Sequence, residues 1–406
     1  MTMLGTIYTS LSGMLGYSKG LDVISNNVAN MNTPGFKGSD VQFEDLYYQQ
    51  HISTVSSNGF SVSQVGSGVK ASSTTTSFAQ GEIRETGTQT DSAINGNGYF
   101  VLLDGTKQTY TRAGQFDFDS SGYLVSKLSG DRVAGVNNVN QLTEINISSF
   151  RSNPPVSTSR ITFLSNLSTG GTTHSIDSVP IYDISGAKHT LKVNFTNNNA
   201  VTPRSWLIEV LDENSAVVSN GEIRFQGNGS PEVGYNQHQF TYTPPNSLPV
   251  DLTFFFGEPG SFSGSTSFSG GTTSTLVTDK IDGYGIGSIT KIATNESGEL
   301  DVTYSNGQTA VAGKLALAHF ENQQVLQQKG SGVFINPITQ NVTIGSANDS
   351  LFGTITGGSL ELSNVELTQQ FTDLVIVQRG YQSSSQVLTV ANEMIQELIN
   401  NTKGKG

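Results

Sequence analysis

The stretch "SNNVANMNTPGFKGSD", residues 25–40, follows an apolar pattern typical of a long helix and ends that helix abruptly. Pro34 keeps Thr33 out of helical backbone angles and has no N–H group of its own, so the helix cannot continue through it. Pro34 and Gly35 then suit the two central positions of a type II turn. Phe36 follows as the apolar side chain that we expect to dock the chain after this turn.

Four asparagines lie at the end of the predicted helix. Asparagine side chains can bond the free carbonyl groups of a last helical turn, and asparagine tolerates left-handed backbone angles. We therefore expect the helix to end by about Asn30 to Asn32. The residues concerned are Asn26, Asn27, Asn30 and Asn32.

Upstream of this stretch, apolar residues recur at alternating spacings of three and four. The spacing predicts a coiled-coil seam, with Ser18 and Ser25 at the two seam positions that lack an apolar side chain. The apolar seam residues are Leu4, Ile7, Leu11, Met14, Leu21 and Val28.

The C-terminal part of the chain repeats the pattern, with Gln370 and Ser384 as the gaps. Before it, the sequence "SNVE", residues 363–366, has the spacing of a capping box and predicts where this helix begins. The apolar seam residues here are Leu367, Leu374, Val377, Tyr381, Leu388, Ala391, Ile395 and Leu398.

One such helix would be compatible with an ordinary amphipathic helix on a globular core. Two of them at opposite ends of a β-like chain favour pairing with each other. An isolated two-helix coil would carry charges beside its seam, whereas this chain has small uncharged residues there, such as Ser10, Gly13 and Ser385. We therefore expect the two seams to be buried in an assembly, as a polymerisation seam.

The composition excludes several classes of protein. Of the 406 residues, 13% are charged and 35% hydrophobic, and the net charge is −12 without a basic stripe, which argues against a nucleic-acid partner. The absence of cysteine excludes disulfides, thiolate zinc sites and a cysteine nucleophile. No basic region followed by an apolar region marks a cleavable signal peptide, and no run reaches the roughly 18 apolar residues of a membrane span. The sequence thus predicts a soluble chain without membrane insertion.

The sequence contains no pattern of catalytic or metal-binding residues. The five histidines show no metal-ligand spacing, and no nucleophile elbow of the form GxSxG is present. The stretch "DFDSSG", residues 117–122, resembles the start of a calcium loop, but Leu128 occupies the twelfth position, where a glutamate is required. We expect a tight turn there, no metal, no cofactor and no enzymatic activity. The histidines are His51, His174, His189, His238 and His319.

Four segments resemble those of the bacterial flagellar rod and hook axial protein family. They are "ISNNVANMNTPGFK" (24–37), "AINGNGYFVLLDG" (93–105), "YTRAGQFDFDSSGYLVSKLSGDRVAG" (110–135) and "ELSNVELTQQFTDLVIVQRGYQSSSQVLTVANEMIQELIN" (361–400). The first contains the family's signature turn, here Asn30, Asn32, Thr33, Pro34, Gly35 and Phe36.

The β-like sequence between the helices divides into three parts. Residues from about 69 to 136 alternate apolar and polar side chains, with Asp104-Gly105 at a turn. A second β-like region extends to about residue 282. A sequence pattern typical of β-hairpins then follows, with turns at Ser297-Gly298 and Asn306-Gly307. By the resemblance, this last part completes the domain that the first begins.

The resemblance and the terminal helices together predict an α+β multidomain fold. The terminal helices pair as a coiled-coil inner domain, and two nested antiparallel β domains are inserted between them. The expected boundaries are residues 1–70 plus 360–406 for the helical domain and connector, 71–140 plus 283–359 for the middle β domain, and 141–282 for the outer β domain.

Within this family, a long chain with a large middle insertion implies a structural subunit of the flagellar hook. Such a subunit would polymerise into a curved helical tube, a universal joint between rod and filament. The resemblance also implies extracellular localisation after export through the flagellum's own type III apparatus, without a cleaved signal peptide. The implied partners are further copies of itself, the hook cap, the distal rod, the hook–filament junction proteins and the hook-length regulator.

Two other functions are compatible with parts of the sequence. A distal-rod or hook–filament junction protein of the same family would share the terminal helices. A secreted β-rich adhesin or carbohydrate-binding protein would suit the polar middle region. Seams at both ends argue against the adhesin, because a monomer cannot bury them alone.

Overall fold

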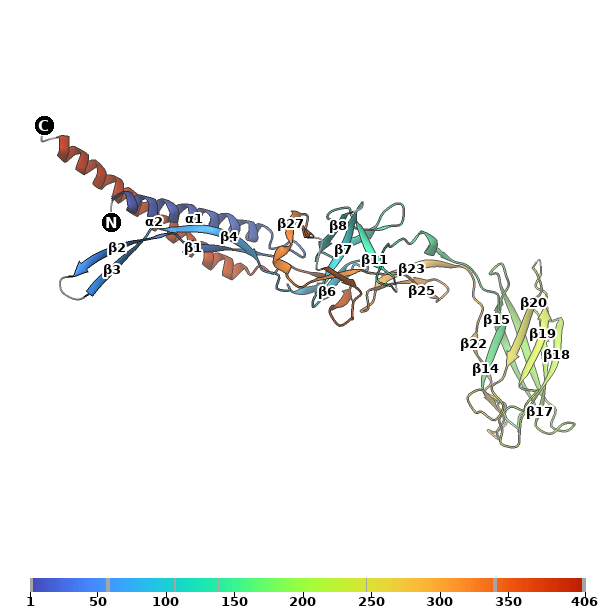
Figure 1. Ribbon diagram of the computed structural model, residues 1–406. Helices are drawn as coiled ribbons and strands as arrows, with labels where there is room; N and C mark the ends of the chain where they lie inside the picture. Colours follow the sequence, from blue (N-terminus) through green and yellow to red (C-terminus); the bar gives the residue numbers. More distant parts are fainter. Residues whose placement is uncertain are drawn as a thin grey trace. The chain divides into compact units, whose positions relative to one another are not determined.

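The computed structural model describes residues 3–55, 59–105, 107–137, 139–245, 247–338 and 342–403. Figure 1 shows the course of the chain. The chain forms two compact units. The first comprises residues 1–148, 292–301 and 311–406, and the second comprises residues 149–291 and 302–310.

Two long helices belong to the first unit and come from the two ends of the chain. Helix α1 spans Met3–Ala29 and helix α2 spans Leu367–Lys403. They lie side by side and contact each other (Figure 1). Both lie where the 3-4 spacing predicts a helix. Within the described residues, neither helix is long and apolar enough to cross a membrane.

The start of α2 differs from the prediction. The Ser363 hydroxyl accepts the N–H of Val365 at 3.3 Å, rather than capping a helix that begins at residue 364. The Asn364 side chain is bound instead to the N–H of Gly38 at 2.8 Å and to the carbonyl oxygen of Ser77 at 2.8 Å. Because these bonds hold the segment outside the helix, α2 begins only at residue 367.

A β-ribbon follows α1. Strand β1 (Ser39–Asp45) pairs antiparallel with β4 (Val69–Thr76), and β2 (Tyr48–Val55) pairs antiparallel with β3 (Gly59–Gly66). The first pair packs on α1: a methyl group on Gly16 would come within 3.2 Å of the Phe43 ring, and the Val69 N–H donates to Ser12 Oγ at 3.3 Å.

A ten-stranded sheet forms the β core of the first unit. Its strands are β7 (Tyr99–Asp104), β8 (Lys107–Thr111), β9 (Phe116–Phe118), β10 (Leu124–Ser126), β11 (Arg132–Val136), β12 (Leu142–Glu144), β26 (Leu317–Phe320), β27 (Gln327–Gly330), β28 (Val333–Ile335) and β29 (Val342–Gly345).

Strand β7 is buried on both faces. Phe100 and Leu102 join one hydrophobic cluster, and Tyr99 and Val101 join another. This is the alternation that a strand imposes, since successive side chains point to opposite faces. Both clusters also contain residues beyond 315, so the two halves of this core come from distant parts of the sequence.

Two short strand pairs connect the C-terminal part of the chain to its N-terminal part. Strand β5 (Ile83–Glu85) pairs with β31 (Ser359–Glu361), and β6 (Ser92–Asn95) pairs with β30 (Thr354–Gly357). Short 3-10 helices span Ser148–Phe150 and Gln323–Val325. A further four-stranded sheet contains β13 (Ser152–Asn153), β23 (Gly287–Thr294), β24 (Glu299–Tyr304) and β25 (Thr309–Lys314).

The turns at Ser297-Gly298 and Asn306-Gly307 are confirmed. Gly298 and Gly307 both have φ of 79°, and each lies between two strands of one sheet. The stretch at residues 117–122 is also a turn, since Gly122 N–H donates to the Asp119 carbonyl oxygen at 3.0 Å between β9 and β10.

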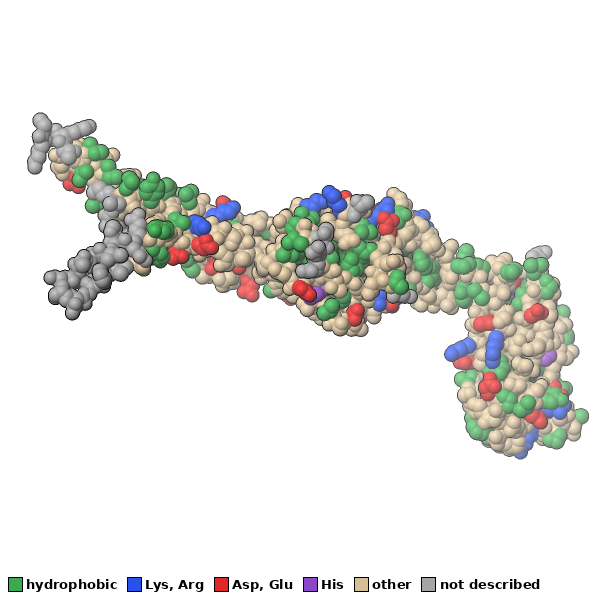
Figure 2. All heavy atoms as spheres, in the orientation of Figure 1, with side chains coloured by type: hydrophobic (Ala, Val, Ile, Leu, Met, Phe, Trp, Pro, Cys, Tyr) green, Lys and Arg blue, Asp and Glu red, His purple; other side chains and the backbone are tan. Residues whose placement is uncertain are grey.

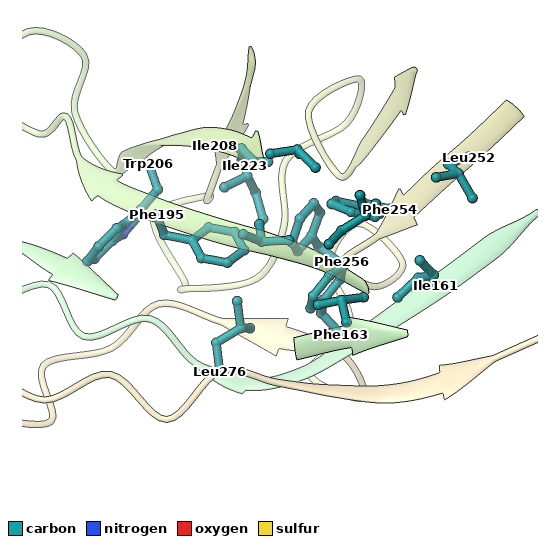
Figure 3. Packing of buried hydrophobic residues seen from close by; sticks show 14 of the residues in the cluster. Ile161, Phe163, Phe195, Trp206, Ile208, Ile223, Leu252, Phe254, Phe256 and Leu276 are labelled. Carbon is teal, nitrogen blue, oxygen red and sulfur yellow. The ribbon is translucent and has the colours of Figure 1, made fainter. Parts of the chain in front are cut away.

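The second unit contains two sheets around one core (Figure 3). One sheet has five strands: β14 (Arg160–Asn166), β19 (Gln237–Tyr242), β20 (Val250–Phe255), β21 (Ser265–Thr266) and β22 (Val277–Ile281). The other has four: β15 (Thr173–Tyr182), β16 (Lys188–Asn197), β17 (Ser205–Leu211) and β18 (Val217–Arg224).

Aromatic side chains from both sheets fill this core. The Phe163 ring lies 5.1 Å from that of Phe254 and 5.0 Å from that of Phe256, centroid to centroid. Phe195 and Trp206 enter from the other sheet and are fully buried (Figure 3). Interleaved apolar side chains from two facing sheets define a β-sandwich.

The prediction of a purely antiparallel outer region is wrong in one respect. Strand β14 pairs in parallel with β20 and with β21, whereas it pairs antiparallel with β22. The reason is topological: the chain leaves β14, builds the whole four-stranded sheet and then returns to lie beside β14. Parallel pairing requires such a long crossover.

Candidate assembly interface

The signature turn has the geometry that its sequence predicts. The N–H of Phe36 donates to the carbonyl oxygen of Thr33 at 3.2 Å, and Gly35 has φ of 69°. Proline at the second position and a left-handed glycine at the third define a type II turn. Helix α1 ends at Ala29, and Phe36 is half-buried after the turn.

The turn is pressed against the β core. A Cβ atom on Gly35 would lie 2.5 Å from the backbone nitrogen of Ala113 and 2.7 Å from the carbonyl carbon of Arg112. The Gly35 N–H also donates to the carbonyl oxygen of Glu361 at 2.8 Å. Gly35 is therefore required by its backbone angle and by the closeness of its neighbours.

The asparagines at the end of α1 have different roles. The Asn30 amide group donates to the carbonyl oxygen of Asn26 at 2.9 Å, as expected for a helix end. Asn27 instead links three elements, because its amide group donates to the Ser39 carbonyl oxygen at 2.8 Å and to Gln370 Oε1 at 3.0 Å. No local sequence pattern marks Asn27 for a contact with α2.

In the contact between α1 and α2, glycines of each helix lie against side chains of the other helix. A methyl group on Gly13 would lie 2.9 Å from Ser384 Oγ, and one on Gly20 would lie 3.2 Å from Val377 Cγ1. Across the same interface, Gly380 faces the Tyr17 ring, 2.5 Å from where its Cβ would be. Side chains of the other helix can lie this close only because these positions have no Cβ atom, so glycine fixes how the helices face each other.

The predicted seam residues of α1 lie beside this contact rather than in it. The buried positions of α1 are Ser10, Gly13, Gly16, Gly20, Ile24 and Asn27. Leu4 is 63% exposed and Leu11 is 43% exposed. Ile7, Met14, Leu21 and Val28 are half-buried. The packed face is thus shifted from the predicted one by about one residue.

In α2 the predicted seam and the contact face coincide more closely. Its gap residues Gln370 and Ser384 contact α1, as does Val377. Ala391 is buried, whereas Leu374, Leu388 and Ile395 are half-buried. Leu367, Tyr381 and Leu398 are exposed by 38%, 36% and 56%.

Both helices expose large apolar side chains. Figure 2 shows hydrophobic side chains gathered on the visible face of the helix pair. An exposed apolar surface of this kind marks an interaction site in soluble proteins. On α1 the residues are Leu4, Tyr8, Leu11 and Leu15; on α2 they include Leu367, Phe371, Val375, Ile376, Val387, Val390 and Met394. We call these residues the exposed stripe; those of α2 lie on more than one side of that helix.

The histidines are not gathered into a site in the described part of the chain. His189 contacts Asp183 at 3.4 Å, His238 contacts Ser219 Oγ at 2.9 Å, and His174 contacts the Leu276 carbonyl oxygen. The described residues contain no group of three side chains suited to hold a metal ion. The side chain of His51 lies outside the described residues.

Three family models match this chain. They are described as "Flagella basal body rod protein" (residues 7–37), "Flagellar hook protein FlgE/F/G D1 domain" (93–162) and "Flagellar basal body rod FlgEFG protein C-terminal" (356–401). The matches include most of α1 with the signature turn, part of the β core, and most of α2.

Full-length relatives and one solved structure agree with these matches. The crystal structure of the Helicobacter pylori flagellar hook protein FlgE2 superposes with a TM-score of 0.51 at 14% identity, over 68% of this chain and 100% of that chain, and supports the fold. The flagellar hook proteins FlgE of Treponema pallidum and Borreliella burgdorferi are each 30% identical to this chain, over 98% of it and 99% of their own length. This chain therefore belongs to the flagellar hook protein family.

Proposed function

We propose that this chain is the structural subunit of the bacterial flagellar hook and that it polymerises head to tail into a curved helical tube. In this assembly the terminal helices pair as a coiled coil and line the tube, and the β domains form outer layers nested between them. The proposed domains are residues 1–70 plus 360–406, 71–140 plus 283–359, and 141–282.

The observation that carries the proposal is the exposed stripe. The two helices pack on each other at Gly13, Gly20 and Gly380. This packing leaves leucine, valine and phenylalanine side chains of the helix pair exposed to water. These side chains are 38–65% exposed, so covering them completely would contribute roughly 0.5–2 kcal/mol each. Further copies of the same chain can cover the stripe. A contact between different surfaces of identical subunits that does not close into a ring generates an open helix.

The polar surface suits a tube that bends while it rotates. Only 13% of residues are charged, and 45 are glycine. Contacts between uncharged polar side chains can be broken and remade at low cost as neighbouring subunits slide. The universal-joint role thus follows from a firm inner wall with a compliant outer surface.

Family membership suggests where the chain acts and with which partners. We propose export through the flagellar type III apparatus, localisation outside the cell in the hook, and contacts with the hook cap, distal rod, junction proteins and hook-length regulator. The distal-rod alternative is weaker, because hook proteins match this chain over nearly the full length of both.

Imaging of the purified chain tests the proposal directly. The full-length protein, concentrated under polymerising conditions and viewed by negative-stain electron microscopy, should form curved tubes of uniform diameter. Discrete monomers or closed rings under all conditions tested would contradict it.

A further inference from the structure

The signature turn, the β core and the segment before α2 meet at three buried charged side chains. These are Lys37, Arg112 and Glu361, which we call the anchor cluster. Lys37 and Glu361 have fully buried side chains, and that of Arg112 is 4% exposed. Lysine, arginine and glutamate are almost never fully buried unless they are paired.

Glu361 is the centre of the anchor cluster. Its Oε1 accepts from Lys37 Nζ at 2.6 Å and from the Gly81 N–H at 2.9 Å, and its Oε2 accepts from Arg112 Nη1 at 3.2 Å. Its backbone carbonyl oxygen accepts the N–H of Gly35 at 2.8 Å. One residue therefore binds three separate segments, at residues 35–37, 81 and 112.

The two cations are held from the other side as well. Lys37 Nζ donates to the Ala79 carbonyl oxygen at 2.7 Å. Arg112 Nη2 donates to the carbonyl oxygen of Gly96 at 2.9 Å, and the guanidinium lies 5.0 Å from the centre of the Tyr99 ring. These bonds fix the positions of both cations relative to the β core.

The electrostatic balance depends on the single carboxylate. Burial lowers the pKa of Lys37, Glu361 opposes that effect, and Arg112 adds to it through repulsion. Without the Glu361 charge, two like charges would remain buried and unpaired. Removing one partner of a buried ion pair is strongly destabilising for this reason.

We infer that Glu361 is the anchor that fixes the segments next to both terminal helices to the β core. The three members lie in three different segments matched by family models: 7–37, 93–162 and 356–401. The inference concerns contacts within one chain, so its failure would leave the proposed hook function standing.

Hydrogen exchange on the full-length protein, read by mass spectrometry, tests the anchor. Glu361→Gln keeps the shape of the side chain and removes its charge. We expect exchange at Gly35 and Gly81 to become about 100-fold faster or more, the change that corresponds to loss of a buried ion-pair partner. The matched control is Glu144→Gln, which breaks the exposed 2.7 Å pair with Arg132 and should leave exchange within about threefold of wild type.

A second variant covers the case in which Glu361→Gln unfolds the first unit. Adding Lys37→Met removes one of the two unpaired cations, so the double variant should recover protection, or folding, relative to Glu361→Gln alone. The inference is overturned if Glu361→Gln exchanges like Glu144→Gln. It is equally overturned if the double variant is no more protected than Glu361→Gln.

Discussion

At the residue scale, Gly35 combines two independent requirements. Its φ of 69° lies in the left-handed region, and the space where a Cβ would be is occupied by the backbone at residues 112–113. Gly105, in the turn after β7, has nearly the same φ of 62°, but apart from its chain neighbours no atom of the described residues lies within 4 Å of its Cβ position. The two glycines separate the effect of conformation from the effect of contact.

We therefore expect Gly35→Ala and Gly105→Ala to lower the free energy of unfolding by different amounts. Gly105→Ala should lower the free energy of unfolding by about 1–2 kcal/mol, the cost of a left-handed alanine. Gly35→Ala should carry the same conformational cost and must also displace a packed backbone. It should therefore lower the free energy of unfolding by roughly 2–5 kcal/mol. Urea unfolding followed by far-ultraviolet circular dichroism measures both. Equal costs would show that the close approach at Gly35 has no energetic weight.

The anchor cluster also shows what single residues in a sequence do not reveal. Lys37 and Glu361 are 324 positions apart, and each stands in a segment of small polar residues where a charge is expected to face water. Burial of both depends on strands β5 and β31 bringing distant segments together. No local pattern contains that information.

At the scale of elements, the two helices could be predicted because a 3-4 spacing of apolar residues is a local property. The face through which α1 packs could not be predicted in the same way. The 3-4 spacing of apolar residues selects Leu4 and Leu11. The contact is instead made at Gly13 and Gly20, because side chains of α2 pack into the space that these glycines leave. The parallel pairing of β14 with β20 was missed for a similar reason, because it depends on the path of the whole outer chain.

The outer sandwich is an element group that we expect to fold alone. Its core cluster contains residues only between 161 and 281, and the chain enters and leaves through paired hydrogen bonds between Val156 and Tyr284 at 3.0 and 2.9 Å. Trp206, the single tryptophan, is 1% exposed in this core, so its fluorescence reports on this part of the chain alone.

A fragment of residues 155–285 should show the buried Trp206 emission and the urea midpoint of the full-length protein. Phe254→Ala should lower the free energy of unfolding by about 3–5 kcal/mol in both fragment and full chain, because it removes a fully buried ring. Phe262→Ala is the control, as that ring is 56% exposed. Solvent-exposed Trp206 emission from the fragment would show that the sandwich needs the rest of the chain.

At the scale of the whole molecule, packing is divided between two purposes. The β units bury their own cores. The terminal helices instead pack on each other at glycine positions and leave large apolar side chains exposed. Exposed apolar side chains contribute little to the stability of a monomer. They would stabilise the proposed polymer, since every added copy can cover the stripe of another.

Leu11→Asp in the full-length protein tests this central claim most directly. Leu11 is 43% exposed in the single chain, so the variant should retain the circular dichroism spectrum and the Trp206 unfolding midpoint of the wild type. In the assembly an unpaired carboxylate would be buried in each subunit at a cost of several kcal/mol, so negative-stain microscopy and sedimentation should find monomers and no tubes. Thr9→Asp places the same charge at an exposed polar position of the same helix and should still polymerise. If Leu11→Asp forms tubes as readily as Thr9→Asp, the exposed stripe of α1 is not a contact between subunits and the proposed inner wall is contradicted.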